Sequence, residues 1–263
     1  MNRVSIGLQA LNDQDLKALG RLHSVREGLD AVETARTIFE RTSFDLIYAR
    51  QDQRLDDWER ELSQALSLGP DHLSLYQLTI EPGTAFGDRY ARGKLPGLPS
   101  EDASADMYEM TQALCDQAGL PAYEVSNHAR PGAESRHNLT YWRSGDWIGI
   151  GPGAHGRFTS AGSRIATETH RAPHVWLSSA LGGSGESERS AFDAEDTLSE
   201  RLMMGLRLAE GVYLSDAGPE FLRRVYEINA LGTKPLLEWS DHALKTTAAG
   251  RPLLNAILRE LLS

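Results

Sequence analysis

One stretch in the middle of the chain, residues 137–156, gathers side chains that can bind a flat, iron-bearing ligand. It reads HNLTYWRSGDWIGIGPGAHG and holds two histidines, three aromatic rings and five glycines. Imidazole and phenol groups can coordinate iron, and aromatic rings provide a stacking surface. The glycines allow a backbone to approach a planar partner closely. The stretch therefore predicts a glycine-rich aromatic hairpin that can hold a planar, metal-bearing ligand.

Arginines on both sides of the stretch fit an acidic ligand. Arg136 and Arg143 flank the aromatic residues, and a guanidinium pairs well with carboxylates such as porphyrin propionates. A structural role stays open for each residue taken singly. Trp142 and Trp147 can anchor a hydrophobic cluster, and a lone histidine is more often a hydrogen-bonded structural residue than a ligand. Of the two histidines, we expect His155 to be the structural one.

A second polar set lies near the start of the chain. Gln9 ends a strand-like run, Arg21 follows twelve positions later, and Asp45 lies in the next such run. The carboxyl ends of parallel strands meet at one edge of a sheet, where such folds bind ligands. An amide, a guanidinium and a carboxylate suit a ligand with an amino-acid end and a sugar. Spacing alone also permits structural roles, with Arg21 paired to Asp15 and Gln9 capping its strand.

The elements that must position these residues follow from the hydrophobic pattern. The first eighty residues alternate between β-branched runs and amphipathic stretches, which is typical of βα units around a parallel sheet. Strands are expected at 3–9, 43–49 and 72–80, and Asn12 is expected to cap a helix. The first strand is expected to leave a bare parallel edge.

A Gly- and Pro-rich connection over 81–100 leaves this sheet. A helix is predicted next, capped by Ser100 and stopped by Gly119. A strand is expected at 121–127, directly before the aromatic stretch.

The C-terminal part is predicted to begin after a flexible link at 181–191. Asp193 or Asp196 is expected to cap a helix, and the remainder resembles a small winged-helix fold. Residues 200–263 carry eight Lys or Arg and eight Asp or Glu. A neutral winged helix is more often a packing module than a DNA-binding domain.

The composition narrows the class of protein. The chain has 263 residues, 40% hydrophobic and 24% charged, and no apolar run long enough to span a bilayer. The start lacks the pattern of a secretory signal, so we expect a cytoplasmic location. A formal charge of −10 disfavours nucleic acid as a partner. Cys115 is the single cysteine, which excludes an internal disulfide and a cysteine-rich metal cage.

These motifs together carry a family resemblance. The chain resembles the oxygen-independent coproporphyrinogen III oxidase-like radical SAM proteins, and its His-Asn-x-x-Tyr-Trp hexad is similar to that of the heme chaperone branch, HemW. The resemblance rests on SIGLQALNDQDLKALGRLHSVREGLDAV, FDLIY, HLSLYQLTIEPGT, DMYEMTQALCDQAGLPAYEVSNHARPG and HNLTYWRSGDWIGIGPGAHG. It extends nearly end to end, since RLMMGLRLAEGV and GRPLLNAILRELL resemble that branch's C-terminal domain.

The resemblance implies an α/β fold in three parts. Residues 1–99 would be the C-terminal part of an incomplete radical SAM (βα) partial barrel. Residues 100–180 would be an α+β extension carrying the heme motif, and residues 192–263 a winged-helix-like domain.

The resemblance also implies ligands. Gln9 and Asp45 would contact the ribose of S-adenosylmethionine, and Arg21 its carboxylate. The heme site would contain His137, as the iron ligand, with Asn138, Tyr141 and Trp142.

Two departures from the family pattern concern the radical chemistry. The family holds a [4Fe–4S] cluster with Cys-x-x-x-Cys-x-x-Cys, and this chain has no such ligands, which a fragment or a truncated gene product would explain. YARQDQ also stands where the family has Tyr-Gly-Leu-Pro-Gly-Gln. Ala49 and Asp52 replace the two glycines, and we expect this to remodel the loop beneath the adenosyl ligand.

The leading functional hypothesis is a heme-binding chaperone that delivers heme to an apoprotein without turnover. The recipient would be a heme protein, for which the resemblance suggests the respiratory chain or another membrane-associated protein, and a homodimer through the bare sheet edge is open. One alternative is a radical SAM enzyme of porphyrin biosynthesis, which the missing cysteines disfavour. A non-catalytic interaction module is another.

Overall fold

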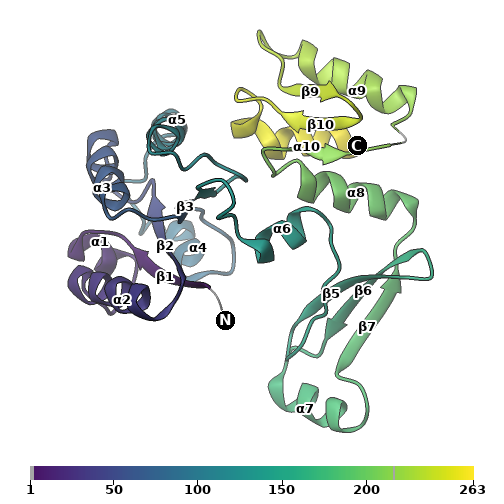
Figure 1. Cartoon of the computed structure of the whole chain (residues 1–263), viewed down its shortest axis with the longest axis horizontal. Coiled ribbons are helices and arrows are strands. Elements are labelled where there is room, and N and C mark those ends of the chain that lie inside the picture. The colour runs from purple at the N-terminus through teal and green to yellow at the C-terminus, as the bar shows by residue number, and fades with distance from the viewer. Residues whose placement is uncertain (1–2, 216) are drawn as a thin grey trace. The chain divides into compact units, whose positions relative to one another are not determined.

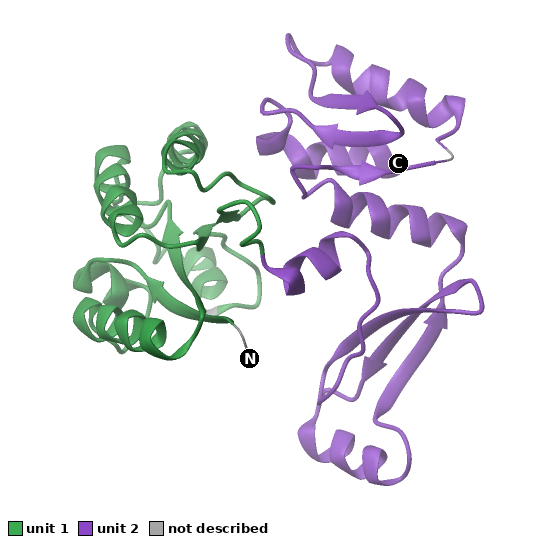
Figure 2. Ribbon diagram, in the orientation of Figure 1, with its two compact units in different colours: residues 1–134 green, residues 135–263 purple. Residues whose placement is uncertain are grey.

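The alternating runs at the start of the chain form a mainly parallel sheet. The computed structural model describes residues 3–215 and 217–263, and the chain divides into two units, residues 1–134 and 135–263 (Figure 2). The first unit contains β1 (Arg3–Gln9), α1 (Asp13–Ala18), α2 (Val25–Ile38), β2 (Arg41–Tyr48), α3 (Leu55–Ser67), β3 (His72–Gln77), α4 (Ala85–Ala91), α5 (Glu101–Gln117) and β4 (Asn127–Ala129) (Figure 1).

The sheet order of the first unit is β1-β2-β3-β4. The first three strands are parallel, and β4 joins β3 antiparallel. β1 therefore lies at an edge of the sheet that the described residues form, as the sequence predicted. The predicted caps are also confirmed, since Asn12 and Ser100 accept hydrogen bonds from the first turns of α1 and α5. Gly119 follows α5 with φ +72°.

The strand predicted at 121–127 was wrong. Pairing with β3 begins only at Asn127 and extends to Ala129. The preceding segment turns instead, because the Glu124 carboxylate accepts hydrogen bonds from the Ser126 amide and the Asn127 side chain. This side-chain bonding offers the backbone an alternative to a strand.

Trp58 on α3 is the centre of the first unit's core. Its side chain is fully buried and its ring stacks on Tyr48, with the ring centroids 5.1 Å apart. Its indole nitrogen donates a hydrogen bond to Thr111 Oγ1 on α5, at 2.8 Å. One aromatic residue thus joins β2, α3 and α5.

The second unit contains two antiparallel sheets and several helices. It contains α6 (Arg136–Trp142), β5 (His155–Ser160), β6 (Ser163–Thr169), α7 (Pro173–Leu181), β7 (Glu186–Ala191), α8 (Ala194–Gly205), β8 (Val212–Tyr213), α9 (Pro219–Ala230), β9 (Leu237–Ser240), β10 (Ala243–Thr246), a 3₁₀ turn (Arg251–Leu253) and α10 (Leu254–Leu262) (Figure 1). Its antiparallel sheets have the orders β5-β6-β7 and β8-β10-β9.

Two predictions for this unit need correction. The aromatic stretch is not a hairpin, because residues 136–142 form α6, capped by Ser135. The flexible link predicted at 181–191 contains β7, which pairs with β6 through residues 186–191. Its polar sequence, ESERSA, gives no core pattern, and backbone pairing with β6 orders it.

Asp193 caps α8, and its capping box with Asp196 is complete. Helix α8 contacts strand β8 of the β8-β10-β9 sheet, and α9 contacts strand β9. Helix α10 packs against α8 and α9. The winged-helix description and the three-part division of the chain stay predictions. No helix among the described residues is long and apolar enough to cross a membrane.

Replacing Thr111 by valine should lower the free energy of unfolding by about 1–3 kcal/mol, because it leaves the buried Trp58 indole without its acceptor. Thr37→Val on the exposed side of α2 should change it by no more than about 0.5 kcal/mol. Urea denaturation followed by circular dichroism measures both. Equal midpoints for the two variants would show that the Trp58 hydrogen bond has no net value.

Candidate functional site

Helix α6 gathers the aromatic rings of the central motif. His137 and Tyr141 lie one turn apart on the same side of the helix, with ring centroids 4.7 Å apart. The Tyr141 ring lies 4.5 Å from that of Trp147. His137 is exposed, and its Nδ1 lies 3.4 Å from Asn138 Oδ1. The rings of His137, Tyr141 and Trp147 thus form a series of three contacting rings, and the exposed imidazole is at one end of it.

The second histidine of the motif has a different setting. His155 begins β5, and its Nδ1 lies 3.4 Å from a carboxylate oxygen of Glu168 on β6. Its carbonyl oxygen accepts a hydrogen bond from Trp147 Nε1, at 3.1 Å. Both histidine side chains reach the surface, so neither imidazole is enclosed in the interior.

Trp147 contacts a charged residue, Arg164, that the sequence did not predict to be part of the site. The Arg164 guanidinium on β6 lies over the Trp147 ring, 5.6 Å from its centroid, and pairs with Asp146 and with Glu200 on α8. These partners lie 18 and 36 positions from Arg164. No spacing rule joins residues so far apart, so the sequence held no signal for them.

The tryptophan of the hexad faces a different part of the second unit. Trp142 lies under the Arg207 guanidinium, 5.5 Å from ring centroid to carbon. Beside it, Arg143 makes two hydrogen bonds to the Glu210 carboxylate, at 2.7 and 2.9 Å. Arg143 therefore already has a carboxylate partner, against the expectation that it awaits a propionate. A hollow of about 330 Å³ lies here, with Trp142, Arg143 and Tyr213 in its wall.

In the first unit the structure brings Gln9 and Arg21 together. Arg21 Nη2 donates a hydrogen bond to Gln9 Oε1 at 3.1 Å. The alternative pairing of Arg21 with Asp15 is not formed, because Asp15 pairs with Arg50. Two side chains predicted to bind the amino-acid end and the sugar of one ligand thus lie within contact at the carboxyl end of β1.

Asp45 lies on β2 beside this pair and has other partners. Ser5 Oγ donates to its carboxylate at 2.8 Å, and Ser74 also hydrogen-bonds it. Burial raises the pKa of Asp45, and these two hydrogen bonds oppose the rise. In register, Gln9 lies opposite Leu46, the next residue after Asp45. The structure therefore joins Gln9 and Arg21, whereas Asp45, on the adjacent strand β2, is bonded to Ser5 and Ser74.

Two residues of the loop after β2 have a left-handed backbone conformation. Ala49 and Asp52, at the two positions where the resembled family has glycine, have φ values of +55° and +58°. Left-handed backbone costs a non-glycine residue roughly 1–2 kcal/mol. The loop is tied to residues 96–97, because the Asp52 amide donates to the Gly97 carbonyl oxygen and Gln51 Nε2 to that of Pro96, both at 2.6 Å.

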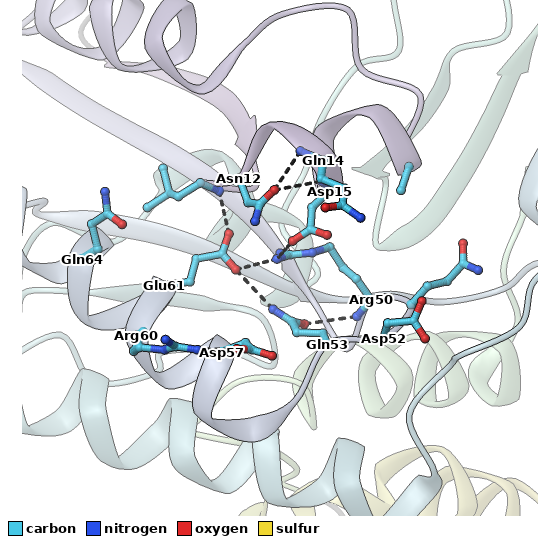
Figure 3. Close-up of a pocket in the computed structure, with 13 residues that line it drawn as sticks. Asn12, Gln14, Asp15, Arg50, Asp52, Gln53, Asp57, Arg60, Glu61 and Gln64 are labelled. Atoms are coloured by element: carbon cyan, nitrogen blue, oxygen red, sulfur yellow. Dashed lines mark hydrogen bonds and ion pairs between the residues drawn. The ribbon is translucent and has the colours of Figure 1, made fainter.

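A hollow of about 610 Å³ lies between α1 and α3, beside this loop (Figure 3). At its centre the buried Arg50 bonds Asp15 at 2.8 Å and Glu61 at 2.6 Å, and Gln53 Nε2 donates to Glu61 at 3.2 Å. These groups bond one another, although the buried Arg50 Nε has no hydrogen-bond partner among the described residues. None of the predicted ligand-binding residues lines the hollow, so its size does not make it the candidate site.

The chain does not fit an iron–sulfur cluster. Cys115 is its one cysteine, and it is buried in the core of the first unit. Burial raises the pKa of its thiol to about 12, whereas a cluster ligand must be a thiolate. Across residues 3–215 and 217–263, no group of three or more His, Cys, Asp or Glu is placed to hold a metal ion.

Two buried histidines lie at the β3–β4 end of the sheet. His72 Nδ1 lies 2.8 Å from Ser43 Oγ, and its Nε2 lies 2.9 Å from the Tyr123 hydroxyl. His128, on β4, is 1% exposed. Burial lowers the pKa of His72 to about 3 and that of His128 to about 4. Both rings are therefore neutral in the folded protein at neutral pH.

The chain is similar to known proteins along its whole length. Residues 192–253 match the family model of the HemN C-terminal domain. The heme chaperone HemW of Escherichia coli is 38% identical over 270 residues, which cover all of this chain and 69% of that protein. The bovine mitochondrial radical S-adenosyl methionine domain-containing protein 1 is 37% identical, and this chain spans 62% of its length.

A solved structure shows the same fold. The coproporphyrinogen III oxidase HemN of Escherichia coli, described as a radical SAM enzyme, superposes with a TM-score of 0.75. The superposition covers all of this chain and 64% of that one, at 21% sequence identity.

Gly97→Ala should destabilise the loop after β2 more than Gly93→Ala does. Both glycines have left-handed φ, +77° and +65°, but a Cβ at Gly97 would collide with the Asp52 carboxylate, while one at Gly93 meets open space. We expect Gly97→Ala to lower the free energy of unfolding by about 1 kcal/mol more. In an Asp52→Gly background the difference should vanish in urea denaturation. A difference that persists would contradict the contact.

Stability should fall on acidification below pH 6.5. His72 and His128 take up protons in the unfolded chain near their ordinary pKa of about 6.5, but stay neutral when folded down to their lowered pKa values. The unfolded state then binds more protons, so each histidine costs up to about 1.4 kcal/mol per pH unit between those limits. Urea denaturation at pH 7.5 and 5.5 measures the slope.

His128→Leu should reduce that slope by about half, because one of the two groups is removed. His174→Leu, at an exposed position of α7, serves as the control and should leave the slope unchanged. Equal slopes for both variants would show that His128 is protonated in the folded state.

Proposed function

We propose a function from one established premise: this chain belongs to the HemW family of heme chaperones. The family predicted from the His-Asn-x-x-Tyr-Trp hexad is thereby confirmed. Because the chain spans 69% of the Escherichia coli relative and 62% of the bovine one, activity and partners are proposed from its own residues.

We propose that the chain binds heme reversibly on the ring series of His137, Tyr141 and Trp147. The observation that carries this proposal is the contact of three rings, at 4.7 and 4.5 Å, ending at an exposed imidazole. Aromatic faces stack on a macrocycle, and a neutral imidazole nitrogen binds iron.

Asn138 supports the iron ligand in this proposal. Its Oδ1 lies 3.4 Å from His137 Nδ1, so Nδ1 is oriented toward a hydrogen-bond partner and Nε2 is left for iron. Trp142, one position after Tyr141, points about 100° away around the helix toward Arg207, so we leave it out of the proposed heme surface. Arg136 is exposed and is the arginine of this motif that we propose for a propionate.

An exposed iron ligand suits the transfer of heme to another protein better than its storage. A single axial ligand on an accessible helix holds heme without enclosing it, so an incoming apoprotein can replace His137 by its own ligand. We propose a recipient heme protein, with respiratory-chain and other membrane-associated proteins as the first class to test, and action in the cytoplasm. A formal charge of −10 argues against nucleic acid as a partner.

Radical chemistry is not part of this proposal. The Arg21 guanidinium suits the carboxylate of S-adenosylmethionine, and Gln9 and Asp45 suit its ribose, so we propose these residues as its binding set. Bound to a [4Fe–4S] cluster, S-adenosylmethionine would supply radical chemistry. With Cys115 buried and alone, no such step is assigned to this chain.

Titration of the purified chain with heme should produce a Soret band at micromolar concentration. His137→Ala should weaken heme binding by about tenfold or more and shift the Soret maximum, because the iron loses its protein ligand.

His174→Ala removes an exposed imidazole of the same unit outside the motif, and should bind heme as the wild type does. Absence of a Soret band in the wild type, or equal loss in both variants, would disprove the proposed site.

A further inference from the structure

Arg164 is a fully engaged guanidinium behind the aromatic rings. Its Nε donates to Glu200 at 3.0 Å, its Nη1 to Asp146 at 3.0 Å and its Nη2 to the Gly145 carbonyl oxygen at 3.1 Å. The side chain is 9% exposed. All three guanidinium nitrogen atoms thus donate hydrogen bonds, and these bonds fix the plane of the guanidinium.

That plane lies against Trp147. The guanidinium carbon is 5.6 Å from the indole centroid, within the range of a cation–π contact. The same indole donates to the His155 carbonyl oxygen and contacts the Tyr141 ring at 4.5 Å. Trp147 is therefore fixed between a charged plane and the ring series proposed for heme.

Glu200 brings the C-terminal domain into this arrangement. It lies on α8, within the segment that matches the HemN C-terminal domain, and is 7% exposed. Its two carboxylate oxygens accept from Arg157 Nε at 2.7 Å and from Arg164 Nε at 3.0 Å. A buried carboxylate needs such partners, so α8 and the β5-β6 strands constrain each other.

We propose that Arg164 is a positioning residue for heme binding, held by Asp146 of the motif loop and Glu200 of the C-terminal domain so that Trp147 stays against Tyr141. The C-terminal domain then contributes to the heme surface through Glu200 without touching heme. This inference rests on the proposed function.

The role requires arginine and not only a positive charge. A guanidinium is planar and presents donors in a fixed fork, so it stacks and pairs at the same time. A lysine ammonium can pair with one carboxylate but offers no plane to the indole.

Arg164→Lys tests the proposal by heme titration. We expect heme to bind about tenfold more weakly, with far-UV circular dichroism unchanged. Arg189→Lys is the matched control, because Arg189 also lies over an aromatic ring, Phe158 at 5.5 Å, and pairs with Glu186, but not in the ring series. It should bind heme as the wild type does.

A double-mutant cycle separates positioning from general destabilisation. If Arg164 acts through Trp147, then Arg164→Lys should weaken heme binding in the wild type but not further in a Trp147→Leu background. A merely structural role would weaken binding by the same factor in both backgrounds, and that result would overturn the proposal.

Asp146→Asn gives a second test if Arg164→Lys does not fold. Its carboxylate is 52% exposed, so the buried pair of Arg164 and Glu200 remains. We expect about threefold weaker heme binding, against no change for Glu188→Gln, which alters the same charge at an exposed position of β7.

The outcomes also separate the two proposals. A wild type that binds no heme overturns the proposed function and the role of Arg164 together. A wild type that binds heme through His137, with folded Arg164→Lys or Asp146→Asn binding equally well, overturns only the role of Arg164.

Discussion

The second unit depends on one buried ion cluster, in which Glu200 pairs with Arg157 and Arg164. Removing three charges from water is costly, and only mutual pairing with directed hydrogen bonds offsets that cost. The cluster has few alternatives, because Arg157 and Arg164 come from paired strands and Glu200 from α8. Such a contact fixes geometry more than it adds stability. The consequence is a motif loop whose tryptophan has a set position.

The first unit shows the opposite use of polar groups. Its hollow between α1 and α3 is surrounded by side chains that bond one another, with Arg50 among Asp15, Glu61 and Gln53. These hydrogen bonds hold the four side chains to one another, with Arg50 Nε left without a partner in the part of the chain that the structure describes. At the carboxyl end of β1, by contrast, Arg21 is exposed and meets Gln9.

A heme carrier and a radical enzyme need different things from one fold. Catalysis requires three thiolates around a cluster, whereas carrying heme requires a flat surface, an iron ligand and easy release. We propose that the exposed imidazole on α6 and its neighbouring rings serve heme binding. The three thiolates are not in this chain, whose single thiol, Cys115, is buried in the first unit's core. The structure is thus consistent with a division of labour in which heme handling depends on α6 and its neighbours.

By itself, the sequence determined the local elements and the family. The strands around Phe44 and Leu73, the caps at Asn12, Ser100 and Asp193, and the hexad were legible because they depend on near neighbours. The sequence also showed that no cluster ligand set exists. These features follow from period, capping chemistry and residue count.

Only the tertiary structure decided what lies behind the motif. It turned the expected hairpin into α6, ordered residues 186–191 as β7 through pairing alone, and brought Arg164 between Trp147 and Glu200. Such contacts join residues far apart in the sequence, so the partner of a charged side chain is known only once the fold is known. His137 as iron ligand stays a prediction from the sequence, whereas the residues that hold its aromatic neighbours in place were found only in the structure.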